Sequence, residues 1–271
     1  MLLFDSQYAS KQLSNFESNM ILPRHRWYEF KEGFTASLVK EAILSVETDG
    51  CRKIRVFDPF GGSGTTSVVA ASSGHLGQSL EVNPFLAYVG KCKSTKVTWS
   101  KKQFKESKLR LLEAGPVKVS PLEGVSTLSE SSWTGKWLFN QEVLRTHASL
   151  MRTTEGMPTG LQQLMKLAVI AATMDVCNAK RDGKCLRYRK KWKEIGFNRG
   201  HLIEALNYRL DQIEEDIAVE PLTGKPRPLF WRGDCRQILP KIKSDSVDLV
   251  VTSPPYLNSF DYSDVIDQNY T

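Results

Sequence analysis

The chain has 271 residues, of which 41% are hydrophobic and 25% charged, and its formal net charge is +7. This composition is typical of a globular protein that buries a core, and no apolar run reaches the roughly 18 residues that span a bilayer. The first residues lack the pattern of a secretory signal, which predicts a cytoplasmic protein. The 5 cysteines are scattered without C-x-x-C spacing, so neither a disulfide framework nor a metal site is expected. The excess of basic residues favours a polyanionic partner such as nucleic acid.

Three regions follow one another along the chain. Residues 1–95 hold an amphipathic helix near Ala36 to Val46, followed by a strand, turn, helix, strand and helix pattern. Residues 96–224 have few strand signals and several amphipathic windows, which predicts a helical insertion. Residues 225–271 return to strands with a short helix between them. This alternation of strands and helices predicts an α/β fold with a parallel sheet.

Local patterns predict the individual elements of these regions. Strands are expected at KIRVFD, QSLEV, LFWRGD and VDLVVT, which are rich in β-branched and apolar residues. Helices are expected at SVVAAS, NPFLAYVGKCK, DCRQILPKI and the windows Gln141 to Met151, Gly160 to Cys177 and Arg199 to Ile217.

A glycine-rich loop follows the first expected strand. Gly61, Gly62 and Gly64 allow a sharp turn and let a ligand approach the main chain closely. Glu81 ends the next strand about 20 residues later, the spacing at which a carboxylate reaches ribose hydroxyls in nucleotide-binding α/β units. The loop matches neither G-x-G-x-x-G nor G-K-[ST], which disfavours dinucleotide hydride transfer and ATP hydrolysis. A sharp turn without a ligand is the alternative interpretation.

A second group of residues follows the last expected strand. Ser253, Pro254, Pro255 and Tyr256 lie at the carboxyl edge of the sheet, where α/β proteins place ligand sites. Two prolines fix the backbone and remove two N–H donors, so the loop presents carbonyl oxygens beside an aromatic ring. These groups suit an exocyclic amine on a stacked base, and a proline turn that ends a strand is the alternative.

A basic segment lies near the middle of the chain. Between Lys180 and Lys193, basic residues alternate with Tyr188 and Trp192 around a single acid, Asp182. Such a cluster can neutralise phosphates and stack on bases, which predicts nucleic-acid contacts. A solvated helical face is the alternative. The expected contact residues are Arg187, Arg189, Lys190, Lys191 and Trp192.

Three sequence stretches, DPFGGSGTT, LEVNP and GDCRQILPKIKSDSVDLVVTSPPY, together resemble motifs of S-adenosylmethionine-dependent DNA amino-methyltransferases. The resemblance implies a Rossmann-like class I methyltransferase sheet. It also implies that loop glycines surround the methionine moiety, that Glu81 holds the ribose, that Asp234 holds the adenine amine and that Asp58 orders the loop or reaches the cofactor. The implied cofactor-binding residues are Asp58, Pro59, Phe60, Gly61, Gly62, Ser63, Gly64, Thr65, Glu81, Asn83, Asp234 and Cys235.

The resemblance further implies transfer of a methyl group to a flipped base in double-stranded DNA, as in restriction-modification. The Ser253 form of the catalytic loop slightly favours cytosine N4 over adenine N6, and an RNA methyltransferase is an alternative. The segment His25 to Thr35 is similar to the family's variable motif X, which closes over the cofactor, although core aromatics are equally expected there.

Family members carry further strands after the S-P-P-Y motif, whereas this sequence has only residues 257–271 there. We therefore expect a sheet with early strands only, whose last strand is an exposed edge unless another chain covers it. Two interpretations follow: a split enzyme completed by a second polypeptide, or a truncated remnant that binds nucleic acid without catalysis.

Overall fold

The computed structural model describes residues 16–30, 33–47, 52–130, 134–182, 185–220, 222 and 229–254. Within these residues the chain forms two compact units. The sheet unit takes residues up to Val97 and from Ile213 onward, and the helical unit takes Thr98–Gln212. Helix α8 (Arg199–Val219) begins in the helical unit and ends in the sheet unit, whereas the sequence division after residue 224 assigns all of it to the insertion.

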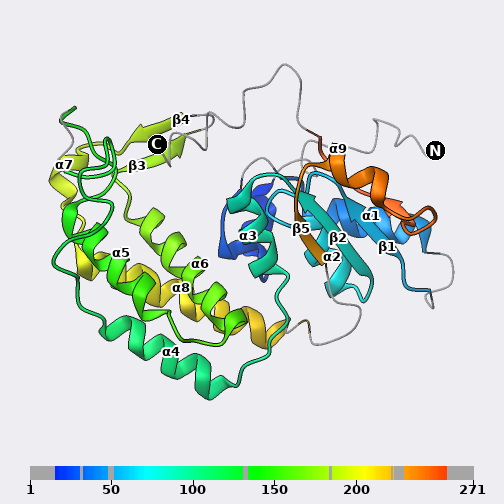
Figure 1. The fold of residues 1–271 in the computed structure, drawn as a ribbon, viewed down its shortest axis with the longest axis horizontal. Coiled ribbons are helices and arrows are strands. Elements are labelled where there is room, and N and C mark those ends of the chain that lie inside the picture. The colour runs from blue at the N-terminus through cyan, green and yellow to red at the C-terminus, as the bar shows by residue number, and fades with distance from the viewer. Residues whose placement is uncertain are drawn as a thin grey trace. The chain divides into compact units, whose positions relative to one another are not determined.

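The sheet unit is built on a parallel sheet that has four strands among the described residues (Figure 1). Their order is β5-β2-β1-β6, and their bounds are Leu229–Arg232, Leu76–Glu81, Arg55–Asp58 and Leu249–Val250. Val56 is the register partner of both Gly77 and Leu249. The winding of the chain reverses at β1, because β2 and β5 lie on one side of it and β6 lies on the other. Such a switch point is where open α/β sheets bind ligands. The predicted α/β fold with a parallel sheet is confirmed, and it is consistent with a Rossmann-like methyltransferase.

The helices of the sheet unit follow the expected positions closely. They are α1 (Ala36–Val46), α2 (Thr65–Ser72), α3 (Pro84–Lys93) and the short α9 (Cys235–Ile238), with 3-10 helices at Phe16–Ile21, His25–Trp27 and Leu239–Lys241. Asn83 caps α3 by accepting from the backbone N–H groups of Phe85 and Leu86, and Pro84 suits the first helical position.

Helix α1 shows why these residues form a core against the sheet. Its apolar residues Val39, Ala42, Ile43 and Val46 recur at helical spacing and so form one stripe. The stripe joins a cluster that includes buried residues of α2, of β1 and next to β1 and β6, namely Ile54, Val56, Val69, Ala70 and Val251.

The helical unit contains α4 (Lys101–Glu113), α5 (Gln141–Thr153), α6 (Thr159–Asp175), α7 (Trp192–Ile195) and the first part of α8. Helix α5 packs against both α4 and α6. The largest fully buried side chains of the helical unit come mainly from α6, including Leu161, Leu164, Met165 and Leu167. The predicted amphipathic windows are therefore helices, and their apolar stripes face a core.

The basic segment forms a structure that the sequence patterns did not predict. Strands β3 (Ala179–Asp182) and β4 (Cys185–Tyr188) pair antiparallel, and α7 follows them. The predicted helical insertion therefore also contains a hairpin, which the sequence patterns did not indicate. The alternative of a solvated helical face does not describe this segment either, because only α7 is helical there. None of the helices in the described part of the chain combines the length and apolarity needed to cross a bilayer.

Candidate cofactor site

The carboxylate of Asp58 lies at the end of β1 and joins three segments at the switch point. Its Oδ1 accepts from the hydroxyl of Thr252 at 2.8 Å and from the backbone N–H of Phe60 at 3.0 Å, and its Oδ2 accepts from the hydroxyl of Thr66 at 3.0 Å. Burial raises the pKa of Asp58 to about 6, although these hydrogen bonds favour its charged form. Asp58 therefore fixes the start of the glycine loop relative to α2 and to the end of β6.

The glycine loop turns tightly between β1 and α2. The N–H of Gly61 donates to the carbonyl of Leu80 at 2.7 Å, and the N–H of Gly64 donates to that of Gly61 at 2.8 Å. Gly62 and Gly64 have φ values of 50° and 93°, which side chains rarely adopt. Within the same turn, Pro59 and Phe60 are half-buried, whereas Ser63 and Thr65 are buried. The loop thus brings its backbone to the carboxyl edge of β1 and β2.

Phe230 on β5 supports this loop with its ring, a role that the sequence patterns did not predict. A Cβ atom would lie 3.1 Å from Cζ of Phe230 if placed on Gly61, and 3.3 Å from its Cε2 if placed on Gly64. On Gly90 of α3 it would lie only 2.3 Å from the same Cε2 atom. The three glycines therefore leave space that the phenyl ring fills. Their spacing gave no direct signal of this contact, because Phe230 follows about 140 residues after Gly90.

Glu81 ends β2 and faces the loop. Its Oε2 accepts from the N–H of Gly62 and its Oε1 from the N–H of Asn83, both at 2.8 Å. Burial raises the pKa of Glu81, and the backbone donors oppose that shift. A carboxylate has about four acceptor positions, so the oriented oxygens retain capacity for hydroxyl donors. Asn83, a predicted site residue, orients Glu81 through its backbone and caps α3 through its side chain.

Asp234 and Cys235 follow β5 at the same edge of the sheet. Asp234 caps α9 by accepting from the backbone N–H of Arg236, and its carboxylate also pairs with the Arg236 guanidinium at 2.6 Å. These hydrogen bonds lower the pKa of Asp234. Cys235 is half-buried and begins α9.

Of the loop that the sequence predicts to be catalytic, only Ser253 and Pro254 lie within the described residues. Ser253 is half-buried and Pro254 is exposed, directly after the end of β6. Thr66 also donates to the carbonyl of Val251 at 3.3 Å, so the approach to this loop is tied to α2. Pro255 and Tyr256 lie outside the described residues.

The segment that resembles motif X lies against the glycine loop at one point. A Cβ atom on Gly62 would lie 3.1 Å from Cε1 of Phe30. Tyr28 packs edge to face on Phe85 of α3, with ring centroids 5.1 Å apart, and Trp27 is buried. The segment therefore contains both core aromatics and a ring beside the candidate site.

The basic residues predicted to contact nucleic acid have two kinds of environment. Arg189 donates to the carbonyl oxygens of Cys177 at 2.7 Å and Asp175 at 2.9 Å, so it caps the end of α6. By contrast, Arg187 and Lys190 are exposed, and Arg187 is the register partner of Lys180 on β3. Like charges directly opposite each other in a hairpin repel.

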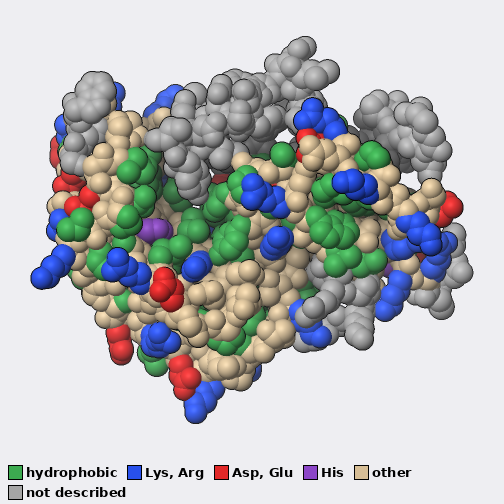
Figure 2. Space-filling view, viewed as in Figure 1, with side chains coloured by type: hydrophobic (Ala, Val, Ile, Leu, Met, Phe, Trp, Pro, Cys, Tyr) green, Lys and Arg blue, Asp and Glu red, His purple; other side chains and the backbone are tan. Residues whose placement is uncertain are grey.

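Aromatic rings accompany these cations in the helical unit. Trp192 packs on Trp137 with centroids 4.7 Å apart and on Tyr188 with centroids 4.9 Å apart. The ammonium group of Lys193 lies over the rings of Trp137 and Trp192, and Lys191 pairs with Glu194 at 3.1 Å. Figure 2 shows Lys and Arg side chains spread across the visible face, with fewer Asp and Glu between them. The rings stabilise one another, and the cations border them.

The fold and the site are consistent with a Rossmann-like α/β unit, with a glycine loop after its first strand and an acidic residue at the end of its second strand. Curated proteins that are similar to this chain include type II methyltransferases. The chain is 24% identical to M.AvaI of Nostoc sp. and equally to that of Anabaena variabilis, over 94% of this chain and 55% of each relative. It is 25% identical to M.BsoBI of Geobacillus stearothermophilus, over 96% of this chain and 54% of the relative.

The chain thus spans about half the length of the curated relatives that it matches. No protein-family model matches it, and no solved structure matches it significantly.

Proposed function

We propose that the sheet unit binds S-adenosylmethionine and that the protein takes part in methylating an exocyclic amino nitrogen of a DNA base. The observation that carries this proposal is the meeting of Asp58, the Gly61 to Gly64 loop, Glu81 and Thr252, the residue before Ser253, at the switch point of a parallel sheet. Similarity to type II methyltransferases over almost the whole chain supports it.

Each group at this edge has a proposed role. Bound S-adenosylmethionine supplies an electrophilic methyl group on a sulfonium. Glu81 accepts from the ribose hydroxyls, and the glycine backbone leaves room for the methionine moiety. Asp234 exchanges its contact with the exposed Arg236 for the adenine amine. Asp58 keeps the loop in place.

The target base is proposed to lie beside the loop after β6. Ser253 and the proline carbonyls accept from the amino group, and Tyr256 stacks on the ring, so the amine nitrogen is oriented toward the methyl carbon. Cytosine N4 is the preferred target and adenine N6 the alternative.

The exposed cations of the hairpin region are the proposed DNA contacts of the helical unit. Arg187, Lys190 and Lys191 would neutralise phosphates, and Trp192 would support them from its aromatic cluster. Arg189 acts through the fold, because its guanidinium caps α6.

The test is a methyl-transfer assay with the full chain, S-adenosylmethionine labelled in its methyl group, and plasmid DNA or a matched RNA. Nucleoside digestion and mass spectrometry identify the product. The proposal predicts N4-methylcytosine or N6-methyladenine in DNA, whereas no labelled base would contradict it and favour a protein that binds nucleic acid without catalysis.

A further inference from the structure

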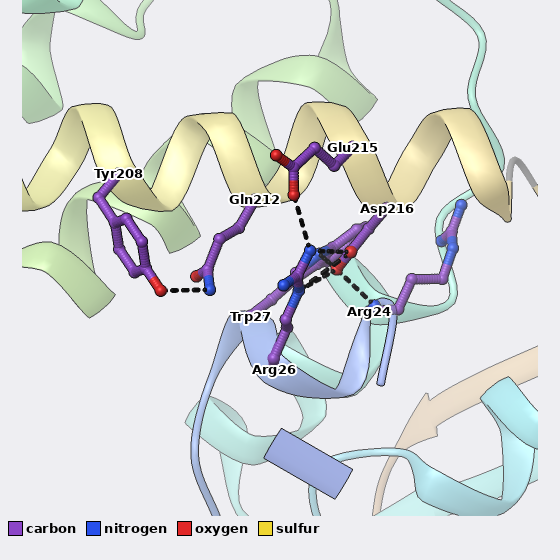
Figure 3. Close-up of polar contacts among 7 residues, drawn as sticks. All are labelled: Arg24, Arg26, Trp27, Tyr208, Gln212, Glu215 and Asp216. Atoms are coloured by element: carbon purple, nitrogen blue, oxygen red, sulfur yellow. Dashed lines mark hydrogen bonds and ion pairs between the residues drawn. The ribbon is translucent and has the colours of Figure 1, made fainter. Parts of the chain in front are cut away.

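A single buried carboxylate near the end of α8 binds several residues of the segment 24–27 in the sheet unit (Figure 3). Asp216 is only 2% exposed, and it accepts from the backbone N–H of Arg24 at 2.9 Å and from the indole N–H of Trp27 at 2.8 Å. The guanidinium of Arg26 donates to it at 2.6 Å. The residues Arg24 and Trp27 lie 192 and 189 positions earlier in the chain. One side chain therefore fixes three residues of a distant segment.

The same segment is also held by the end of α3 and the residues after it. The guanidinium of Arg24 donates from Nη1 to the carbonyl oxygens of Lys93 at 2.7 Å and Thr95 at 2.9 Å. The ammonium group of Lys93 donates to the carbonyl of Tyr28 at 2.9 Å. Arg24, Lys93 and Asp216 are all buried, and hydrogen bonds to charged groups are stronger away from water.

This segment contacts the glycine loop through Phe30. Three residues after Trp27, the ring of Phe30 lies against Gly62, where a Cβ atom would be 3.1 Å away. The N–H of Gly62 donates to Glu81, the residue proposed to hold the ribose. A shift of Trp27 would therefore move Phe30, and the loop would lose the contact between Phe30 and Gly62.

We infer that Asp216 is a positioning residue for the methyl-donor site, holding residues 24–30 so that Phe30 packs on Gly62 and Gly62 stays bonded to Glu81. This inference rests on the proposed function, because it assigns Asp216 to the donor site named there. Asp216 acts through Arg24, Arg26 and Trp27.

The experiment compares Asp216→Asn with Glu215→Gln in the full chain. Glu215 is adjacent, pairs with the same Arg26 at 3.1 Å and is 70% exposed, so its substitution makes the same charge change without touching Trp27. Calorimetric titration with S-adenosylhomocysteine gives the Kd of the site and, through the stoichiometry, the folded fraction. The variant Trp27→Phe keeps an aromatic ring and removes the indole N–H that reaches Asp216.

We expect Asp216→Asn to weaken binding about tenfold or more and Trp27→Phe about threefold to tenfold, at full stoichiometry, while Glu215→Gln stays within about twofold. Wild-type Kd values in Asp216→Asn and Trp27→Phe would overturn the inference, whether or not the stoichiometry falls, because Asp216 would then act only on folding. If the unmutated chain bound no S-adenosylhomocysteine, the proposed function would fail and the inference with it.

Discussion

The hydroxyl of Thr252 donates to Oδ1 of Asp58 at 2.8 Å across 194 residues of sequence, and this bond joins the ends of β6 and β1. Asp58 also holds the first turn of the glycine loop through Phe60, so one buried carboxylate links the proposed donor loop to the start of the proposed catalytic loop. The two loops therefore share a support, and changes at Asp58 should affect both.

Replacing Asp58 with Asn should change how stability depends on pH. Burial raises the pKa of Asp58 to about 6, above its ordinary value of 3.8, so the folded protein binds this proton more tightly than the unfolded chain. The stabilisation from this group is therefore full below pH about 4 and is lost as pH rises through about 6. The free energy of unfolding of the wild type, relative to Asp58→Asn, should fall by about 2 kcal/mol between pH 4 and pH 7.

Urea unfolding of both proteins between pH 4 and pH 7 measures this difference, and the subtraction cancels groups that titrate alike in the two proteins. A difference that stays constant with pH would show that the Asp58 carboxyl is not perturbed in the folded state.

The contact between Gly90 and Phe230 predicts an unusual response to alanine. Alanine normally stabilises the interior of a helix by about 1 kcal/mol relative to glycine. In α3, however, the added Cβ would lie 2.3 Å from Phe230, so Gly90→Ala should destabilise the protein by about 1–3 kcal/mol through overpacking. Gly115→Ala is the control, because a Cβ there meets nothing within 4 Å, and it should change stability by less than about 0.5 kcal/mol.

Denaturant midpoints of the two glycine variants give the comparison. Stabilisation by Gly90→Ala would contradict the proposed support of the glycine loop by Phe230.

Two neighbouring cations should separate folding from nucleic-acid binding. Arg189→Gln removes hydrogen bonds to the carbonyl oxygens of Asp175 and Cys177 and should destabilise the protein by about 2 kcal/mol. Lys190→Gln changes an exposed side chain and should leave stability within about 0.5 kcal/mol. It should instead reduce the slope of log K against log salt for duplex DNA by about 1.

Fluorescence anisotropy of a labelled duplex at several salt concentrations, together with urea unfolding, measures both effects. The assignment of these roles fails if Lys190→Gln binds DNA with an unchanged salt slope, or if Arg189→Gln is as stable as the wild type.

Much of the fold follows from local sequence. The apolar stripe of α1 and the Asn83-Pro84 start of α3 mark these helices, because capping and periodicity act over a few residues. The hairpin of β3 and β4 was missed because its strands, AKRD and CLRY, lack β-branched residues and carry charges. The dipeptide Asp182-Gly183, which begins at the last residue of β3, is a sequence typical of hairpin turns and could have indicated the hairpin.

The candidate site was only partly predictable for a different reason. The glycines and Glu81 form a short-range pattern that can be recognised in the sequence. Thr252, Phe230 and Asp216 act on residues far away in the chain, and a single sequence carries no signal for such contacts. Tertiary packing places Phe230 against the loop, Thr252 against Asp58, and Asp216 against the segment that contains Trp27.

The measurement that tests the central claim most directly is a calorimetric titration of S-adenosylhomocysteine into the full chain and into Glu81→Gln. Gln keeps the size of Glu81 but loses the charge that strengthens hydrogen bonds from ribose hydroxyls. Glu106→Gln, on α4 of the helical unit and 59% exposed, is the control. We predict one site in the wild type and in Glu106→Gln, with binding about 10- to 100-fold weaker in Glu81→Gln. No binding by the wild type, or equal affinity in Glu81→Gln, would contradict a methyl-donor site at this edge of the sheet.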